Sequence, residues 1–148
     1  VPGGHDEIRH RAGFDYELLE RLEAGLQLFG HEVKSLRARQ GSLAGAFVII
    51  RGNEAWLVNA QIPPCRRANT PTRYDPTRPR KLLLHRRELE TLTGAASQKG
   101  LTLVPIRVYT HGTRIKMEFA LARHKKKGDK RAAIREREDK REIRRSLK

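Results

Sequence analysis

The sequence has little sulfur, few aromatic side chains and no long apolar run. Cys65 is the only cysteine, so no internal disulfide can form, and we expect a reducing, cytoplasmic location. Aromatic residues make up 5% and hydrophobic residues 37% of the 148 positions, which predicts one domain with a modest core. No apolar stretch approaches the roughly 20 residues of a membrane span. The first residues, VPGGHDEIRHRAG, lack the apolar segment of a secretory signal.

Catalytic and metal-binding patterns are also missing. The six histidines are scattered, and none has the spacing of a metal pair with another histidine or with Cys65. The chain has neither a G-x-x-x-x-G-K-[ST] phosphate loop nor a G-x-S-x-G nucleophile elbow. We therefore expect a binding protein that needs no metal or cofactor, and not an enzyme.

Positive charge is what the sequence has in excess. Lys and Arg number 32 against 17 Asp and Glu, for a formal net charge of +15. Such an excess favours a nucleic-acid partner, because each contact with a phosphate releases a condensed counterion. A solubility role or an anionic membrane surface is the alternative, but no strongly amphipathic basic helix supports the membrane.

The charge is concentrated at the C-terminal end. Residues 123–148 hold 13 Lys or Arg and five Asp or Glu, with few large apolar side chains. This segment cannot bury enough apolar surface to order by itself, yet it is rich in good helix formers. We expect three parts: an N-terminal arm (1–13), a folded domain (14–122) and a basic tail (123–148), disordered when free and helical when docked.

The folded domain has mainly strand patterns. Residues 114–122 alternate, with Ile115, Met117, Phe119 and Leu121 predicted to point inward. A second strand is predicted just before, and Pro105 in it indicates an edge or a bulge. Gly52-Asn53 predicts a tight hairpin between 46–51 and 54–60. The proline-rich segment 61–80 is predicted to be a loop.

Two helices are predicted around these strands. One covers 33–41, with Gly41 suited to end it, and a longer one covers 80–100. In the longer helix Leu82, Leu89, Leu92 and Ala96 form one stripe. Leu83 falls outside the stripe, so it either packs elsewhere through an irregular first turn or is exposed to meet a partner.

Residues 15–29 are ambiguous. Leu18, Leu22, Leu26 and Phe29 fit a helix, which the pattern alone favours. Gly25 weakens that helix, and the alternative is a strand with Ala24, Leu26 and Leu28 on one face.

Four motifs occur together in a specific order: GHEVKSLRA, DPTRPRKLLLHRRELETL, QKGLTLVPIRVY and LALARHKKKGDKR. In this order and spacing the chain resembles, over residues 14–148, the small protein B family of bacterial tmRNA-binding proteins, also called SsrA-binding proteins. The resemblance implies a small antiparallel β-barrel of the OB type with flanking helices and a basic tail. It also implies that residues 15–29 form a strand, and we follow it there.

The resemblance implies a function in trans-translation, the rescue of stalled ribosomes. The barrel would bind the tRNA-like domain of tmRNA, and the tail would enter the empty mRNA channel near the decoding centre. Alanyl-tRNA synthetase and elongation factor Tu would act on the same complex, and the protein would be a monomer without bond chemistry of its own. The implied tmRNA-binding residues are Glu32, Lys34, Ser35, Arg37, Asn69, Arg78, Arg80, Lys81, Leu83 and Lys99, and the implied ribosome-binding residues of the tail are Lys125, Lys126, Lys127, Asp129, Lys130, Arg131, Arg135 and Arg141.

Glu32 is the residue that fits a phosphate-binding surface least well. We hypothesise that it reads RNA bases, or that it orients Lys34 or Arg37 through charge-assisted hydrogen bonds. The alternative is an ordinary surface ion pair, worth about 0–1 kcal/mol. Arg78, Arg80 and Lys81 are expected to act mainly through phosphate.

Two other binding functions compete with this one. A basic structural protein of the ribosome would also carry such a tail, but it would be found on vacant ribosomes without tmRNA. A general single-strand binder would need stacking aromatic residues on its strands, and the available ones are expected in or near the core.

Overall fold

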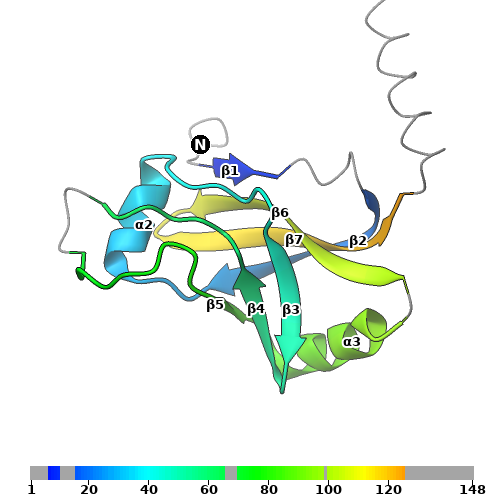
Figure 1. Ribbon diagram of the computed structural model, residues 1–148. Coiled ribbons are helices and arrows are strands. Elements are labelled where there is room, and N and C mark those ends of the chain that lie inside the picture. Colours follow the sequence, from blue (N-terminus) through cyan, green and yellow to red (C-terminus); the bar gives the residue numbers. More distant parts are fainter. Residues whose placement is uncertain (1–6, 11–15, 66–69, 99, 126–148) are drawn as a thin grey trace, which may run out of the picture.

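The computed structural model describes residues 7–10, 16–65, 70–98 and 100–125. Within them it has two helices and seven strands (Figure 1). The elements in chain order are β1 (Glu7–Arg9), β2 (Tyr16–Leu26), α2 (Gly30–Arg37), β3 (Phe47–Arg51), β4 (Glu54–Val58), β5 (Arg80–Leu83), α3 (Arg86–Ala96), β6 (Leu101–His111) and β7 (Arg114–His124). No helix in the described part of the chain is both long and apolar enough to cross a membrane.

The strands form one antiparallel sheet whose hydrogen bonds close into a ring. The order around it is β6, β3, β4, β5, β2 and β7, and β7 pairs with β6 again. The short strand β1 is added to β6, where Ile8 faces Val108. The expectation of a mainly β, antiparallel domain with flanking helices is confirmed. The ordered sheet includes β1 from the predicted N-terminal arm and continues to His124.

The core lies inside the ring. On β7 the inward residues Met117 and Phe119 have no exposed surface, and Ile115 and Leu121 are each 8% exposed, as the alternation predicted. A residue of this size stabilises the fold by about 1.5–3 kcal/mol when fully buried.

The turn signals were placed correctly. Gly52 adopts a left-handed φ of 62° between β3 and β4, which pair in register from Phe47 with Val58 to Arg51 with Glu54. The β6–β7 pairing shifts register between Pro105 and Arg107, so Pro105 marks a bulge.

The helix that the pattern favoured for residues 15–29 is wrong, and the strand implied by the resemblance is correct. β2 pairs with β7 along its length, and a register shift between Leu18 and Glu20 interrupts its alternation. After that shift Ala24 and Leu26 point inward, 3% and 7% exposed. A Cβ at Gly25 would lie 3.3 Å from the Leu83 side chain, so glycine permits the close approach of β5 there.

The long helix predicted for 80–100 is also corrected. Its first part is strand β5, whose Leu82 is buried opposite Ala55 of β4, and only 86–96 is helical. The reason is tertiary: β5 joins β4 to β2 and closes the ring, which outweighs the helix propensity of the leucine run. The shorter helix, predicted for 33–41, spans Gly30–Arg37, so Gly41 does not end it. The residue directly after the C-cap Ala38 is Arg39, which has a left-handed φ of 58°.

Candidate nucleic-acid interface

The site is built around the start of α2. Glu32 lies in the first turn, and its Oε1 accepts a hydrogen bond of 2.8 Å from the backbone amide of Phe29, the residue that caps the helix. This arrangement satisfies a donor that the helix itself leaves unpaired. Unlike most glutamates in a first turn, Glu32 has no exposed surface.

Three side chains from the segment that follows β4 converge on this carboxylate. Arg78 donates from Nε at 3.1 Å to Oε2 and from Nη2 to Oε1, which makes a bidentate pair. Arg80 Nε donates at 2.7 Å, and the Tyr74 hydroxyl lies 2.9 Å away, both at Oε2. We call Glu32, Tyr74, Arg78 and Arg80 the Glu32 cluster. The partners of Glu32 in this cluster are not Lys34 or Arg37, so the expectation that Glu32 orients those two residues is corrected. Because Glu32 is fully buried, it is also not part of an ordinary surface ion pair.

Arg80 differs most from its prediction. The side chain is completely buried, and its remaining nitrogens donate to the carbonyl of Ala60 at 2.8 Å and to Pro76 and the Tyr74 hydroxyl at 2.9 Å. With all three of its nitrogens bonded inside the protein, Arg80 holds the loop before β5 against α2. A direct contact with phosphate is not compatible with this position.

The hydrogen bonds of the cluster keep Glu32 ionised. Burial by itself would raise the pKa of Glu32, but bonds from Arg78, the Phe29 amide and Arg80 outweigh it and lower the pKa to about 2. Burial and the neighbouring carboxylate raise the pKa of Tyr74 to about 12. The cluster therefore has fixed charges over the physiological pH range.

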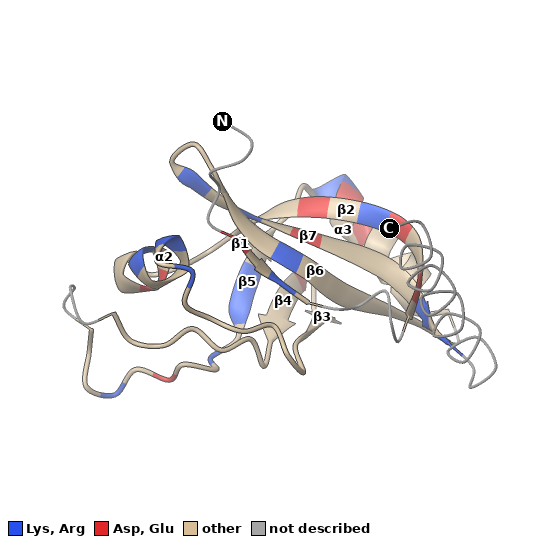
Figure 2. Cartoon of the chain, turned by 90° about the horizontal axis from the view of Figure 1, so that it is seen from above, with Lys and Arg blue, Asp and Glu red and all other residues tan. Residues whose placement is uncertain are grey.

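The exposed side of α2 carries cations. Lys34 and Arg37 line an open hollow of about 1220 Å³ together with Pro63, Pro64 and Cys65. Figure 2 shows both signs of charge on α2 and along β2, but the one acid of α2, Glu32, is buried, whereas Lys34 and Arg37 are exposed. Ser35 points the other way: it is buried and donates to the Pro63 carbonyl at 2.7 Å, so it fixes the wall of this hollow and does not face it.

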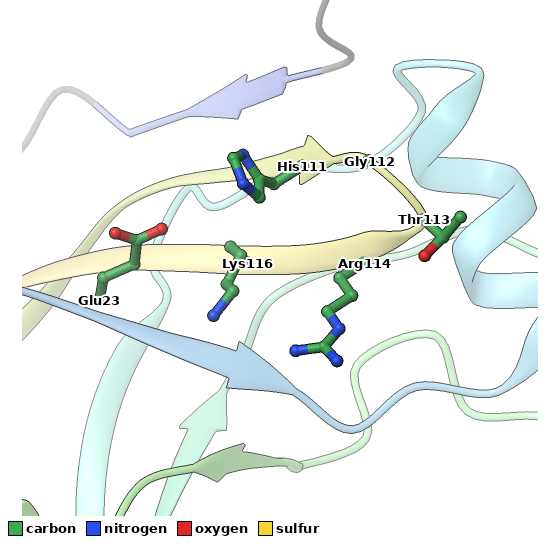
Figure 3. A pocket seen from close by; sticks show the side chains of 6 residues that line it. All are labelled: Glu23, His111, Gly112, Thr113, Arg114 and Lys116. Atoms are coloured by element: carbon green, nitrogen blue, oxygen red, sulfur yellow. The ribbon is translucent and has the colours of Figure 1, made fainter.

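A second part of the surface surrounds β5. Leu83 is 55% exposed, which decides against a core position, and it lines a hollow of about 460 Å³ with Arg114 and Lys116. Lys81 is partly exposed, and its Nζ lies 3.1 Å from Oε1 of Glu54, in an ion pair. The next hollow, of about 700 Å³, adds His111 and Glu23 to the same two cations (Figure 3). Arg37 joins both parts, since its Nη2 lies 3.5 Å from the Thr113 carbonyl.

Comparisons with known proteins match nearly the whole chain to one family. The sequence profile of the SmpB protein family matches residues 8–148. The chain belongs to the SmpB protein family. A relative named SsrA-binding protein from Synechococcus sp. (strain JA-3-3Ab) is 53% identical over 93% of this chain and 90% of its own length. Another of that name, from Roseiflexus sp. (strain RS-1), is 48% identical over 93% of this chain and 87% of its own.

A solved structure shows the same fold. It is described as "tmRNA-SmpB: a journey to the center of the bacterial ribosome", with 41% sequence identity and a TM-score of 0.69 over 88% of this chain and 95% of the other. The resemblance to this family in four sequence motifs is confirmed.

Part of the predicted SmpB site lies outside the described residues. This applies to Asn69 and Lys99 and to the tail from residue 126 on, namely Lys126, Lys127, Asp129, Lys130, Arg131, Arg135 and Arg141. Lys125 is described and follows directly after β7.

Sequence reasoning missed the structural part of this SmpB site. Tyr74 lies 42 residues from Glu32, and no local pattern marks it as a partner. Arg114 and Lys116 were not predicted as site residues: Lys116 was expected only to point outward from its strand, and Arg114 was not singled out. Their spacing of two on β7 was the available signal that both side chains share one face.

Proposed function

We propose that this chain is an RNA-binding adaptor that binds the tRNA-like domain of tmRNA and takes part in trans-translation on the ribosome. The observation that carries the proposal is the match, over 93% of the chain, to proteins named SsrA-binding protein. The solved tmRNA–SmpB structure supports the ribosome as its place of action. The sheet topology and the SmpB relationship support a barrel of the OB type.

The proposed tmRNA surface has two kinds of residue. Lys34, Arg37, Lys81 and Leu83 are exposed enough to contact RNA, and cations there attract phosphate from any sequence. Glu32, Ser35 and Arg80 act as positioning residues, because their polar groups are bonded within the protein. Asn69 and Lys99 complete the proposed surface.

The tail supplies the second activity in this proposal. Its residues Lys125, Lys126, Lys127, Asp129, Lys130, Arg131, Arg135 and Arg141 are proposed to follow rRNA phosphate in the mRNA channel toward the decoding centre. Ordering such a segment costs on the order of 1–2 kcal/mol per residue for the backbone. Charge-assisted contacts and helix formation must offset that cost, because the tail has few apolar groups.

The proposal also covers the location of the protein, its oligomeric state and the other proteins that act with it. The protein would act in the cytoplasm as a monomer, without bond chemistry of its own. Alanyl-tRNA synthetase and elongation factor Tu would act on the same complex.

Truncation after Lys125 tests the proposal and leaves β7 intact. The truncated chain should stay folded and bind tmRNA in solution, but it should support no tagging in a reconstituted assay with stalled ribosomes. Full tagging would refute the role of the tail, and loss of binding in solution would place the tail in the primary RNA site. Sequencing the RNA that co-purifies with the full chain gives the control. One dominant tRNA-like species is expected, whereas association with vacant ribosomes without tmRNA would indicate a structural ribosomal protein.

A further inference from the structure

Phe29 is an exposed aromatic side chain next to the Glu32 cluster. Its side chain is 52% exposed although its backbone amide is bonded to the buried carboxylate. The Arg78 guanidinium carbon lies 4.0 Å from the centre of the Phe29 ring, in a cation–π contact. A single exposed apolar side chain is ordinary on a protein surface. An exposed aromatic ring with an arginine stacked on it is not explained by that rule.

Arg78 is held firmly in this position. Its Nε and Nη2 are bound by Glu32, and its Nη1 donates to the Pro79 carbonyl at 3.3 Å. All three nitrogens thus have partners inside the protein, and Glu32 neutralises much of their charge. Arg78 is therefore poorly placed to grip phosphate, but its flat guanidinium is fixed against the ring. A planar group fixed in advance loses little further freedom when a ligand stacks on it.

His31 supports the ring from the side. Its ring centre lies 5.6 Å from that of Phe29, with an angle of 39° between the planes, and 4.5 Å from that of Tyr74 in an edge-on contact. The His31 side chain is only 7% exposed, and neither ring nitrogen has a hydrogen-bond partner among the described residues. Burial and the ring contacts on two sides hold His31 in place, so it supports the Phe29 ring.

We propose that the Phe29–Arg78 pair is a stacking site for one unpaired base of the bound RNA. This inference rests on the proposed tmRNA function and adds a contact of a different kind to it. Unpaired bases in loops are recognised by stacking on aromatic rings and guanidinium planes. Lys34 and Arg37, in the last turn of the same eight-residue helix, attract the phosphates of a bound strand, so an unpaired base of that strand is the matching ligand for the ring at the other end.

Three variants separate stacking from other effects. Phe29→Leu keeps an apolar side chain but removes the ring, and Phe29→Trp enlarges the ring. Phe47→Leu is the matched control, because Phe47 on β3 is 39% exposed and is far from the cluster in sequence. The measured quantity is the dissociation constant for a transcript of the tRNA-like domain of tmRNA, at several salt concentrations.

Phe29→Leu should weaken binding by about fivefold or more, with an unchanged slope against salt, because stacking releases no counterions. Phe29→Trp should bind at least as tightly as the wild type. Its indole emission should fall when RNA is added, after subtraction of the change seen for the wild type, whose only tryptophan is Trp56. Phe47→Leu should bind like the wild type.

Two results would overturn the inference. If Phe29→Leu binds as the wild type does and the tryptophan at position 29 shows no quenching, no base stacks there. If Phe29→Leu and Phe47→Leu weaken binding equally, the effect is general. A wild-type chain that fails to bind the transcript would instead overturn the proposed function itself, so the two failures are distinguishable.

Discussion

The two helices begin in the same way and yet differ in what they build. In α2, Glu32 bonds the amide of Phe29 at 2.8 Å, and in α3, Glu88 bonds the amide of His85 at 3.1 Å. Glu32 is fully buried and holds two arginines, whereas the bond at Glu88 lies at the surface. Figure 1 shows the helices on different sides of the sheet.

The difference comes from distant sequence and not from the helices themselves. A glutamate three residues after the cap is enough to bond the cap amide in both places. Only at α2 does a loop deliver Arg78 and Arg80, which lie 46 and 48 residues from Glu32. A buried carboxylate is tolerated there because every one of its lone-pair directions meets a donor. At α2 the local capping motif is thus also part of a cluster of tertiary contacts.

The largest expected effect is the contrast between Glu32→Gln and Glu88→Gln. The first leaves two arginines without their counter-charge in a buried site and should destabilise the fold by about 3–5 kcal/mol. The second loses only a surface cap bond, worth about 0.5–1 kcal/mol. Urea denaturation measures both. Equal, small losses would show that the Glu32 cluster is not a structural centre.

Glu32→Gln should also separate specific from non-specific RNA binding. Specific binding of tmRNA should weaken, since Arg78 and the loop lose their fixed position, while affinity for unrelated RNA stays similar or rises as a negative charge is removed. Competition assays with tmRNA and unrelated RNA report this. A parallel rise in both affinities would mean that Glu32 acts only as a repelling charge.

Measuring the unfolding free energy as a function of pH tests the same role of Glu32, with an expected effect slightly smaller than that of Glu32→Gln. The folded-state pKa of Glu32 is lowered from 4.5 to about 2, so its stabilisation is complete above about pH 5 and is lost as pH falls toward 2. The full span corresponds to about 3 kcal/mol. The stability difference between wild type and Glu32→Gln should therefore shrink steadily over that range. A difference that does not change with pH would contradict the lowered pKa.

Leu83, just before α3, should affect binding and not stability. Leu83→Asp is expected to weaken tmRNA binding about tenfold or more while changing the unfolding free energy by less than about 1 kcal/mol, since the side chain is already exposed. Leu92→Asp is the matched control: Leu92 is 3% exposed on α3, and a buried charge there should unfold much of the protein. A large drop in melting temperature for Leu83→Asp would assign Leu83 to the core.

The smallest expected effect is on the salt dependence of binding. Lys34→Ala on α2 and Lys81→Ala on β5 should each reduce the slope of log affinity against log salt by roughly one ion. Arg86→Ala should leave the slope unchanged, because Arg86 lies at the start of α3, 92% exposed and paired with Glu90. Equal slopes for Lys34→Ala, Lys81→Ala and the wild type would remove both lysines from the interface.

The parts of the fold that are local were predictable. The hairpin at Gly52, the alternation of β7 and the bulge at Pro105 each depend on a few neighbouring residues, and the structure has all three. β2 was predictable only through the family resemblance, because its bulge makes a strand look like a helix. β5 was missed, since its leucines become a strand only when β4 and β2 pair with them.

For the proposed site, the sequence and the family resemblance named residues but did not show where their side chains point. The local pattern left the exposure of Leu83 as one of two alternatives, and the choice of Leu83, Lys34 and Arg37 as site residues came from the family resemblance. That Arg80 and Ser35 turn inward does not follow from local pattern, because their partners, Glu32 and Pro63, are 48 and 28 residues away. An arginine beside a proline-rich loop is as consistent with phosphate as with a buried carboxylate, and only the tertiary contact decides.

The way in which the ring of strands closes has a consequence for the binding of partners. Each of its six strands has two neighbours, but two of the contacts that close the ring are short: β2 pairs with β5 only at Gly25 and Leu26, and β3 pairs with β6 only at Val48. Strand β1, which pairs with β6 and has three residues, provides only a very short open edge. The longer open edge is on β2, whose residues 16–24 pair with β7 on one side and have no strand partner on the other among the described residues. That edge carries four charged side chains, Glu17, Glu20, Arg21 and Glu23, and charges on an edge strand oppose edge-to-edge self-association.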